Sequence, residues 1–496
     1  MTFPATDGIT DRLQALFAYD ASSPLIFSSG LFLFLFAGFL LVYSVFRRAP
    51  MARIVYVIAF SLYFYYKSSG IYFLLLVFAA ASDFLIARGI YRARFRWTKR
   101  WLVVLSVAVN LGMLGYFKYT NFLIDISNQL FGQGFLQFQN IFLPVGISFF
   151  VFQSMSYTID IYRGQLKPLS NWLDYLFYLS FFPQLVAGPI VRARDFIPQI
   201  RQNPVVVTRE MFGTGVFLIL TGLFKKAIIS DYISLNFVDR IFDEPLLYSG
   251  FECLMGIYGY ALQIYCDFSG YSDMAIGIAL LLGFRFPKNF DAPYKSATIT
   301  EFWRRWHISL STWLRDYLYI SLGGNRKGRI RTYGNLLLTM LLGGLWHGAA
   351  WQYVVFGLLH GIILCMERLG LRRALEQLPR LFRHLYTVVL LWLTLVIFGA
   401  PGLSEGLAVL KGIFTWQSGA KGYTLAAFAD TKLLLILAAS FLLCGPVQAL
   451  CPKLKAALYA KKAPSPAGMA GLLVLLFLGL MRVTAGTYSA FIYFQF

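Results

Sequence analysis

Residues 332–366 read TYGNLLLTMLLGGLWHGAAWQYVVFGLLHGIILCM and contain no Asp, Glu, Lys or Arg. A helix needs roughly 20 residues to cross a bilayer, so this run is long enough for two membrane segments. Gly343, Gly344 and Gly348 lie in its middle, where they favour a kink. The run therefore predicts two apolar segments that meet near these glycines, in a protein that lies in a membrane.

Uncharged runs recur along the whole chain. The long ones cover 21–46, 101–117, 126–159, 175–191, 385–404, 433–452 and 463–481, and the shorter ones cover 54–66, 68–82, 211–224, 253–266 and 274–284. Together they predict about 11–13 membrane-embedded segments, some of them re-entrant. The expected fold class is all-α, a polytopic integral membrane protein.

The composition excludes a soluble globular enzyme, a disordered chain and a nucleic-acid-binding domain. Apolar residues make up 58% of the 496 positions. Only 14% are charged, against about 25% in an average soluble domain. The net charge is +21, but the basic residues lie between uncharged runs, as the positive-inside rule predicts for cytoplasmic loops. The expected partner of this surface is the lipid bilayer, with no nucleic acid.

The basic loops set the expected topology. Loops 47–53 and 88–100 are rich in Arg and should be cytoplasmic, which places the N-terminus outside. The stretch 172–191 has basic flanks on both sides and contains Pro183 and Pro189, so we expect it to be re-entrant. We find neither a cleaved signal peptide nor an internal repeat. The expectation is a polar segment over 1–20, then a single membrane domain over 21–496.

His347 is the strongest candidate for chemistry. It lies in the sequence LLGGLWHGAA, as the only ionisable group in the deepest part of an uncharged run. Because burying an ionisable side chain in a membrane costs free energy, such a residue is a functional candidate by default. The flanking glycines would let a substrate or another backbone approach the imidazole. The alternative is a hydrogen-bonded core histidine in a helix-packing glycine cluster.

The other three histidines are weaker candidates. His360 also lies in the run, and a hydrogen bond to a neighbouring helix is enough to explain it. His384 lies at the edge of a basic loop, where we expect an interfacial role. His307 belongs to EFWRRWHISLSTWLRDYLY, 301–319, in which Trp and Leu recur at helical spacing. We expect an amphipathic helix there, with a Thr298–Glu301 capping box. It either anchors the protein at the cytoplasmic leaflet or directs His307 toward the cavity of His347.

Two aspartates, Asp267 and Asp273, bracket a polar break between apolar runs. An unwound or bent membrane helix would explain the break. Because buried charges need partners, we expect the two carboxylates to pair with arginines of 285–305.

Motifs of other catalytic classes are missing from the sequence. There is no GxSxG, no GxGxxG, no P-loop and no metal-ligand spacing, so we expect neither a metal nor a tightly bound cofactor. What remains is a histidine in an apolar site that could take a proton from a hydroxyl or a thiol. This pattern suits acyl transfer in a membrane cavity.

Several longer motifs carry a resemblance to a known family. They are LGYFKY at 114–119, LPVGISF at 143–149, FQSMSY at 152–157, DIYRG at 160–164, PQLVAGP at 183–189, DFSGYSDMA at 267–275, 301–319, LGGN at 322–325 and LWHG at 345–348. In order and length they resemble the membrane-bound O-acyltransferases, specifically the bacterial branch that includes the membrane subunit of alginate O-acetylation. The resemblance covers about 110–362.

The resemblance implies a fold, a site and a reaction. The fold would be a ring of tilted helices around a thin centre, in the bacterial inner membrane. His347 matches the proposed catalytic base of the family, and His307 matches its second polar position. A cytoplasmic thioester, expected to be acetyl-CoA, would give up its acetyl group there. A periplasmic partner of the SGNH-hydrolase-like type would carry the group to an exopolysaccharide such as alginate or cellulose.

Two other functions remain open at this stage. The resemblance extends more distantly to the D-alanyl transferases of teichoic acid modification. A transporter or flippase would instead use His347 as a proton or substrate site, and a structural scaffold would not need this histidine.

For the donor phosphates, the sequence offers Arg304, Arg305, Lys288, Lys295 and Arg326 as candidate contacts.

Overall fold

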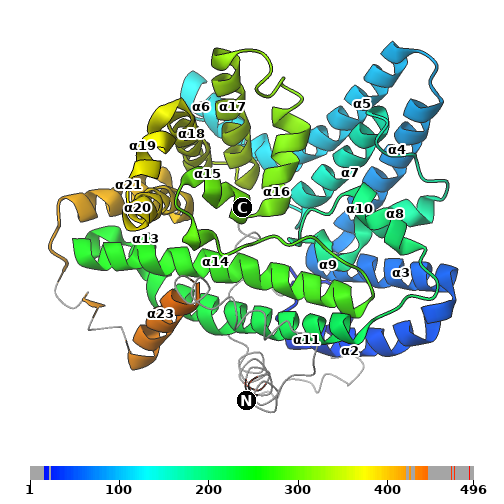
Figure 1. Ribbon diagram of the computed structural model, residues 1–496, viewed down its shortest axis with the longest axis horizontal. Helices are drawn as coiled ribbons and strands as arrows, with labels where there is room; N and C mark the ends of the chain where they lie inside the picture. The colour runs from blue at the N-terminus through cyan, green and yellow to red at the C-terminus, as the bar shows by residue number, and fades with distance from the viewer. Residues whose placement is uncertain are drawn as a thin grey trace. The chain divides into compact units, whose positions relative to one another are not determined.

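A computed structural model describes residues 16–21, 24–420, 424, 425 and 430–444, and the positions 471, 474, 477 and 491. All regular elements in these residues are helices (Figure 1), which confirms the all-α class. Within this described part of the chain, six stretches are long and apolar enough to cross a membrane: Gly30–Arg48, Pro50–Arg92, Arg96–Phe131, Arg209–Asp243, Trp351–Gln377 and Arg380–Gly399. The higher count of 11–13 segments stays a prediction. The structure does not describe most of the polar segment 1–20 or of the uncharged run 463–481. The end of the run 433–452 also lies outside the described residues.

The chain divides into two compact units. The first comprises Met1–Thr120, Phe138–Val206 and Leu282–Phe284. Its helices are α2 (Gly30–Val45), α3 (Pro50–Ser69), α4 (Phe73–Arg92), α5 (Arg96–Leu114), α7 (Ile147–Tyr162), α8 (Trp172–Ser180), α9 (Phe182–Leu185) and α10 (Ala193–Ile200).

The second unit comprises Asn121–Gln137, Val207–Leu281 and Arg285–Phe496. Its main helices are α6 (Thr120–Phe131), α11 (Arg209–Leu223), α12 (Asp231–Ile233), α13 (Asp239–Asp243), α14 (Gly250–Leu281), α15 (Ile299–Arg305), α16 (Ile308–Trp313), α17 (Arg329–His347), α18 (Trp351–Met366), α19 (Arg372–Gln377), α20 (Arg380–Gly399), α21 (Leu403–Phe414) and α23 (Thr431–Cys444). A π-helix follows α11 over Phe224–Ser230, and another follows α16 over Leu314–Tyr319.

The predicted break in 172–191 is present in the first unit. Helix α8 ends at Ser180, and α9 covers only Phe182–Leu185 before the backbone turns again. All residues from 174 to 193 are buried. The broken backbone is therefore surrounded by protein, as non-helical backbone at membrane depth has to be.

A buried carboxylate joins the helices of the first unit. Asp83 of α4 accepts hydrogen bonds from Ser106 Oγ (2.6 Å) and Asn110 Nδ2 (2.7 Å) of α5 and from Ser154 Oγ of α7. Ser154 also lies 3.0 Å from the Tyr175 hydroxyl of α8. Since a buried carboxylate is costly without donors, this network fixes the packing of four helices.

Two glycine pairs bring α11 and α14 together in the second unit, where the helices run side by side (Figure 1). A Cβ atom on Gly222 would lie 2.5 Å from the carbonyl oxygen of Gly270. A Cβ on Gly215 would lie 2.9 Å from that of Gly277. Small residues at this spacing let two antiparallel helices approach closely. Helix α14 is continuous from Gly250 to Leu281, so the unwound alternative for the segment between the two aspartates is wrong, while a bend stays a prediction.

The two aspartates of α14 are paired with lysines rather than with the predicted arginines. Lys225 Nζ lies 2.6 Å from Asp273. Lys226 Nζ lies 2.6 Å from Asp267 and 2.8 Å from Asp231, in a fully enclosed group. The π-helix that carries both lysines explains the difference. Its wider turn places consecutive lysines against one face of α14, which sequence spacing did not reveal.

We expect Lys226→Ala to destabilise the protein strongly, because it leaves two buried carboxylates without their ammonium group. Breaking a buried pair typically costs about 3–5 kcal/mol. Lys225→Ala is the matched control and should cost less, since the Lys225–Asp273 pair is partly exposed. Thermal unfolding of the two variants in detergent measures the difference. Equal losses would contradict a special role for the enclosed group.

Candidate functional site

The apolar run that contains His347 folds into two helices, α17 and α18, as predicted. The break falls at Gly348–Ala350, so His347 is the last residue of α17. A Cβ atom on Gly344 would lie 2.3 Å from the carbonyl oxygen of Tyr353, and one on Gly348 would overlap the Tyr353 ring. The glycines therefore let α18 approach the end of α17, which holds the imidazole in a fixed place.

His347 lies among aromatic rings. Its side chain is buried, with 4% of its surface exposed. Its ring centre lies 5.1 Å from that of Trp346, 5.2 Å from Phe398 and 6.4 Å from Phe356.

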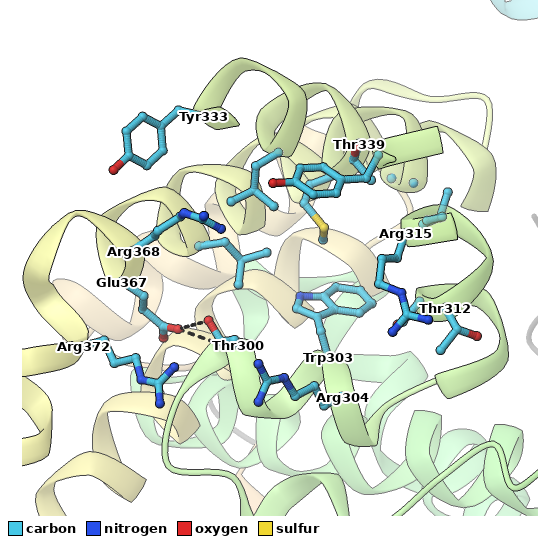
Figure 2. A pocket seen from close by; sticks show the side chains of 18 of the residues that line it. Thr300, Trp303, Arg304, Thr312, Arg315, Tyr333, Thr339, Glu367, Arg368 and Arg372 are labelled. Carbon is cyan, nitrogen blue, oxygen red and sulfur yellow. Dashed lines mark hydrogen bonds between the residues drawn. The ribbon is translucent and has the colours of Figure 1, made fainter. Parts of the chain in front are cut away.

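A large cavity leads to His347. Its volume is about 1280 Å³, and His347, Phe356, Met340 and Trp303 contribute to its wall. Drug-sized ligands occupy cavities of roughly 300–1,000 Å³, so this one suits a longer molecule. Residues from α15 to α19 line it (Figure 2). Its charged lining comprises six arginines and two glutamates: Arg304, Arg315, Arg329, Arg368, Arg372, Arg373, Glu367 and Glu376.

The arginine set differs from the one that the sequence suggested. Among the five predicted basic residues, Arg304 is the one that lines this cavity. Arg305 pairs with Glu301 at 2.9 Å, and Lys288 pairs with Asp291. The remaining arginines come from the π-helix after α16, the start of α17, the π-helix that follows α18, and α19. Helical spacing alone could not show that these segments meet.

The amphipathic helix predicted over 301–319 is interrupted. Helix α15 ends at Arg305, and His307 adopts a left-handed backbone conformation with φ of 43°. Asn289 explains the new start, because its carbonyl accepts from Ile308 N (2.9 Å) and its side chain accepts from Ser309 N (3.2 Å). The capping box is present in a shifted form. Thr298 accepts from Glu301 N, while the Glu301 carboxylate accepts from Ala297 N.

His307 lies behind the cavity wall. It has no exposed surface, and its ring centre lies 4.5 Å from Phe268 and 6.1 Å from Trp346. Among the described residues that line the cavity, His347 is included and His307 is not. Burial holds the pKa of His307 well below its usual range, and the nearby His347 lowers that pKa further. The two histidines are therefore neighbours, with Trp346 in contact with both.

The remaining histidines have structural partners. His360 Nδ1 accepts from the Trp303 indole N–H (3.2 Å), so its proton is on Nε2, which lies 3.1 Å from Thr394 Oγ1. This bonding fits the structural interpretation of His360. His384 Nδ1 lies 3.2 Å from the carbonyl oxygen of Ser296 and does not line the cavity described above.

No cluster of three or more His, Cys, Asp or Glu in the described part of the chain is arranged to hold a metal ion. The cavity supplies instead a cationic surface for an anionic ligand and an imidazole for proton transfer.

Comparison with known proteins assigns these features to a family. Residues 129–415, more than half of the chain, match the model of the MBOAT, or membrane-bound O-acyltransferase, family. All the lining residues named above lie inside this range.

Three relatives illustrate the similarity. The chain is 42% identical over 405 residues to "Probable alginate O-acetylase AlgI" of Pseudomonas aeruginosa, covering 79% of this chain and 76% of that protein. It is 38% identical over 511 residues to the protein of the same name in Azotobacter vinelandii, with 95% and 100% covered. It is 37% identical over 421 residues to "Peptidoglycan O-acetyltransferase" of Helicobacter pylori, with 78% and 80% covered.

We expect His307 to make the fold sensitive to acid. Its imidazole is held neutral in the folded protein, while its ordinary pKa is 6.5, so the unfolded chain binds the proton first. Its contribution to stability is therefore complete above pH 6.5 and is lost as pH falls below that value, by up to about 1.4 kcal/mol per pH unit.

Thermal unfolding midpoints between pH 7 and pH 5 test this expectation. His307→Asn removes the titrating group, and Asn tolerates a positive φ. The variant should lose less stability over this range than the wild type. Parallel losses would contradict the assignment to His307.

Proposed function

The chain belongs to the membrane-bound O-acyltransferase family and is a multi-pass membrane acyltransferase, and we propose that it transfers acetyl groups from a cytoplasmic thioester. The proposed donor is acetyl-CoA, and the proposed location is the bacterial inner membrane. The acetyl group is destined for hydroxyls of an exopolysaccharide such as alginate. A periplasmic protein of the SGNH-hydrolase-like type completes the route.

The arginine-lined cavity beside His347 is the observation that carries this proposal. Six arginines and two glutamates make up its charged lining. Because guanidinium groups bind phosphates well, the phosphate-bearing end of coenzyme A suits this surface. The cavity is also large enough for an extended ligand whose thioester reaches the imidazole. Relatives named for O-acetylation of alginate and of peptidoglycan support acetyl as the group and a polysaccharide as the acceptor class.

In the proposed reaction, His347 acts as general base. It takes the proton of an acceptor hydroxyl while the hydroxyl oxygen attacks the thioester carbonyl. The C–S bond then breaks, and the departing thiolate takes the proton back from the imidazolium. The products are an acetyl ester and a free thiol, and His347 returns to its neutral state.

His307 keeps a supporting role in this proposal. Its buried position behind Trp346 and its electrostatic contact with His347 fit a group that tunes or orients the base.

We expect His347→Ala to reduce ester-linked acetate on the exopolysaccharide by about 10²-fold or more, because general-base catalysis contributes roughly 10²–10⁴. Wild type and variant are expressed at matched levels in membranes, and acetate is released by mild alkali and measured. His384→Ala is the matched control, since His384 does not line the cavity. If the His347→Ala cells carry as much ester-linked acetate as wild-type cells, His347 is not the general base, and a transport or scaffolding role becomes the better explanation.

A further inference from the structure

Glu367 is a buried acid in the wall of a cationic cavity. It directly follows α18, and 2% of its surface is exposed. Burial of a carboxylate is unfavourable unless it is paired or hydrogen-bonded. Among the described residues, no Lys or Arg nitrogen lies within ion-pair distance of this carboxylate, although arginines line the same cavity.

The carboxylate is committed to the start of α15 instead. Oε1 accepts from Ile299 N at 2.7 Å, and Oε2 accepts from Thr300 N at 2.9 Å and from the Thr300 hydroxyl at 2.5 Å. Figure 2 shows the side chains of Glu367 and Thr300 joined in this way. Oε1 also accepts from the Tyr386 hydroxyl at 3.2 Å. Three of these four bonds come from the first turn of α15, and the fourth comes from α20.

Helix α15 depends on such external support. It has 7 residues, and isolated helices shorter than about 12–15 residues are marginal in water. The first four backbone N–H groups of a helix have no partner within the helix. Glu367 satisfies the first two of them, and Thr298 satisfies the third.

A second anchor lies one turn further along α15. The indole N–H of Trp303 donates to His360, seven residues before Glu367 on the same helical stretch, and His360 contacts Thr394 of α20. Hydrogen bonds to His360 of α18 and to Glu367, directly after α18, therefore hold α15 at Trp303 and at its first turn. Trp303 and Arg304 both line the cavity, so the two anchors fix the wall that a donor would touch (Figure 2).

We propose that Glu367 is a positioning residue for donor binding, which holds α15 so that Trp303 and Arg304 present the donor surface of the cavity. This inference rests on the proposed function. Although Glu367 carries a negative charge, it would favour binding of the anionic donor by holding α15 in place. It also separates Glu367 from the other lining acid, Glu376, whose carboxylate pairs with Arg372 at 2.8 Å.

Electrostatics and positioning predict opposite effects of removing the charge. If Glu367 acted only through its charge, Glu367→Gln would make the cavity more cationic and tighten donor binding. If Glu367 positions α15, the amide nitrogen of Gln cannot accept, so the bond from one of the two backbone N–H groups of α15 is lost. Binding of the donor should then weaken, while the chemistry at His347 continues once donor is bound.

The test uses inverted membrane vesicles that contain the full-length protein. The apparent KM for acetyl-CoA and the kcat are measured from release of free thiol, with His347→Ala vesicles as the blank. The dissociation constant for CoA is measured separately by calorimetry on the purified protein. We expect Glu367→Gln to raise the KM and the dissociation constant roughly tenfold, with kcat retained within about threefold.

Glu376→Gln is the matched control, because it removes the same charge from the same wall without touching α15. It should lower the KM for acetyl-CoA. A Glu367→Gln variant whose KM also falls or stays unchanged would overturn the proposal, and so would loss of kcat at unchanged KM.

A second variant covers the case in which Glu367→Gln fails to fold. Thr300→Val removes one bond to the carboxylate and should raise the KM by about threefold; an unchanged KM would also overturn the inference.

A wild type that binds CoA but releases no thiol contradicts the proposed function, and the CoA dissociation constants then still decide the role of Glu367. A wild type that does not bind CoA contradicts both.

Discussion

The cost of burying a polar group in apolar surroundings governs this structure, because each such group has to find partners within the protein. Asp83 is surrounded by hydroxyl and amide donors from α5 and α7. Lys226 lies between two carboxylates. Glu367 binds the first turn of α15. Each group joins helices of its own unit, so these polar contacts help to fix the packing of the helices within each unit.

The site combines two environments with different physical properties. At one side, arginines from several helices create a cationic surface, on which an anionic ligand exchanges water for guanidinium groups. Beside His347, aromatic rings supply apolar surroundings, and 4% of the surface of His347 is exposed. A thioester with a phosphate-bearing carrier matches both environments, since its charges and its reacting carbon lie at opposite ends. The short helix α15 contributes to both environments, because Arg304 and the aromatic Trp303 both line the cavity.

Sequence patterns predicted the parts of this molecule that depend on local composition. The uncharged run around His347 gave its two helices and the break at the glycines, and the prolines of 183–189 gave the broken backbone after α8. Contacts between distant segments could not be predicted. The left-handed turn at His307 depends on Asn289, the partners of Asp267 and Asp273 depend on a π-helix, and the charged lining depends on α19. Glu367 had no signal, because a glutamate beside a basic loop looks like a solvated charge.

We propose that a phosphate-bearing thioester occupies the cavity with its carbonyl beside His347. A structure of the full chain with a non-reactive thioether analogue of acetyl-CoA would show where this ligand binds. We expect the phosphates against Arg304, Arg368 or Arg372, the pantetheine arm along Trp303, and the sulfur within hydrogen-bonding reach of the His347 imidazole. An analogue that binds outside this cavity, or one whose sulfur lies far from His347, would show that His347 is not positioned to act on the thioester.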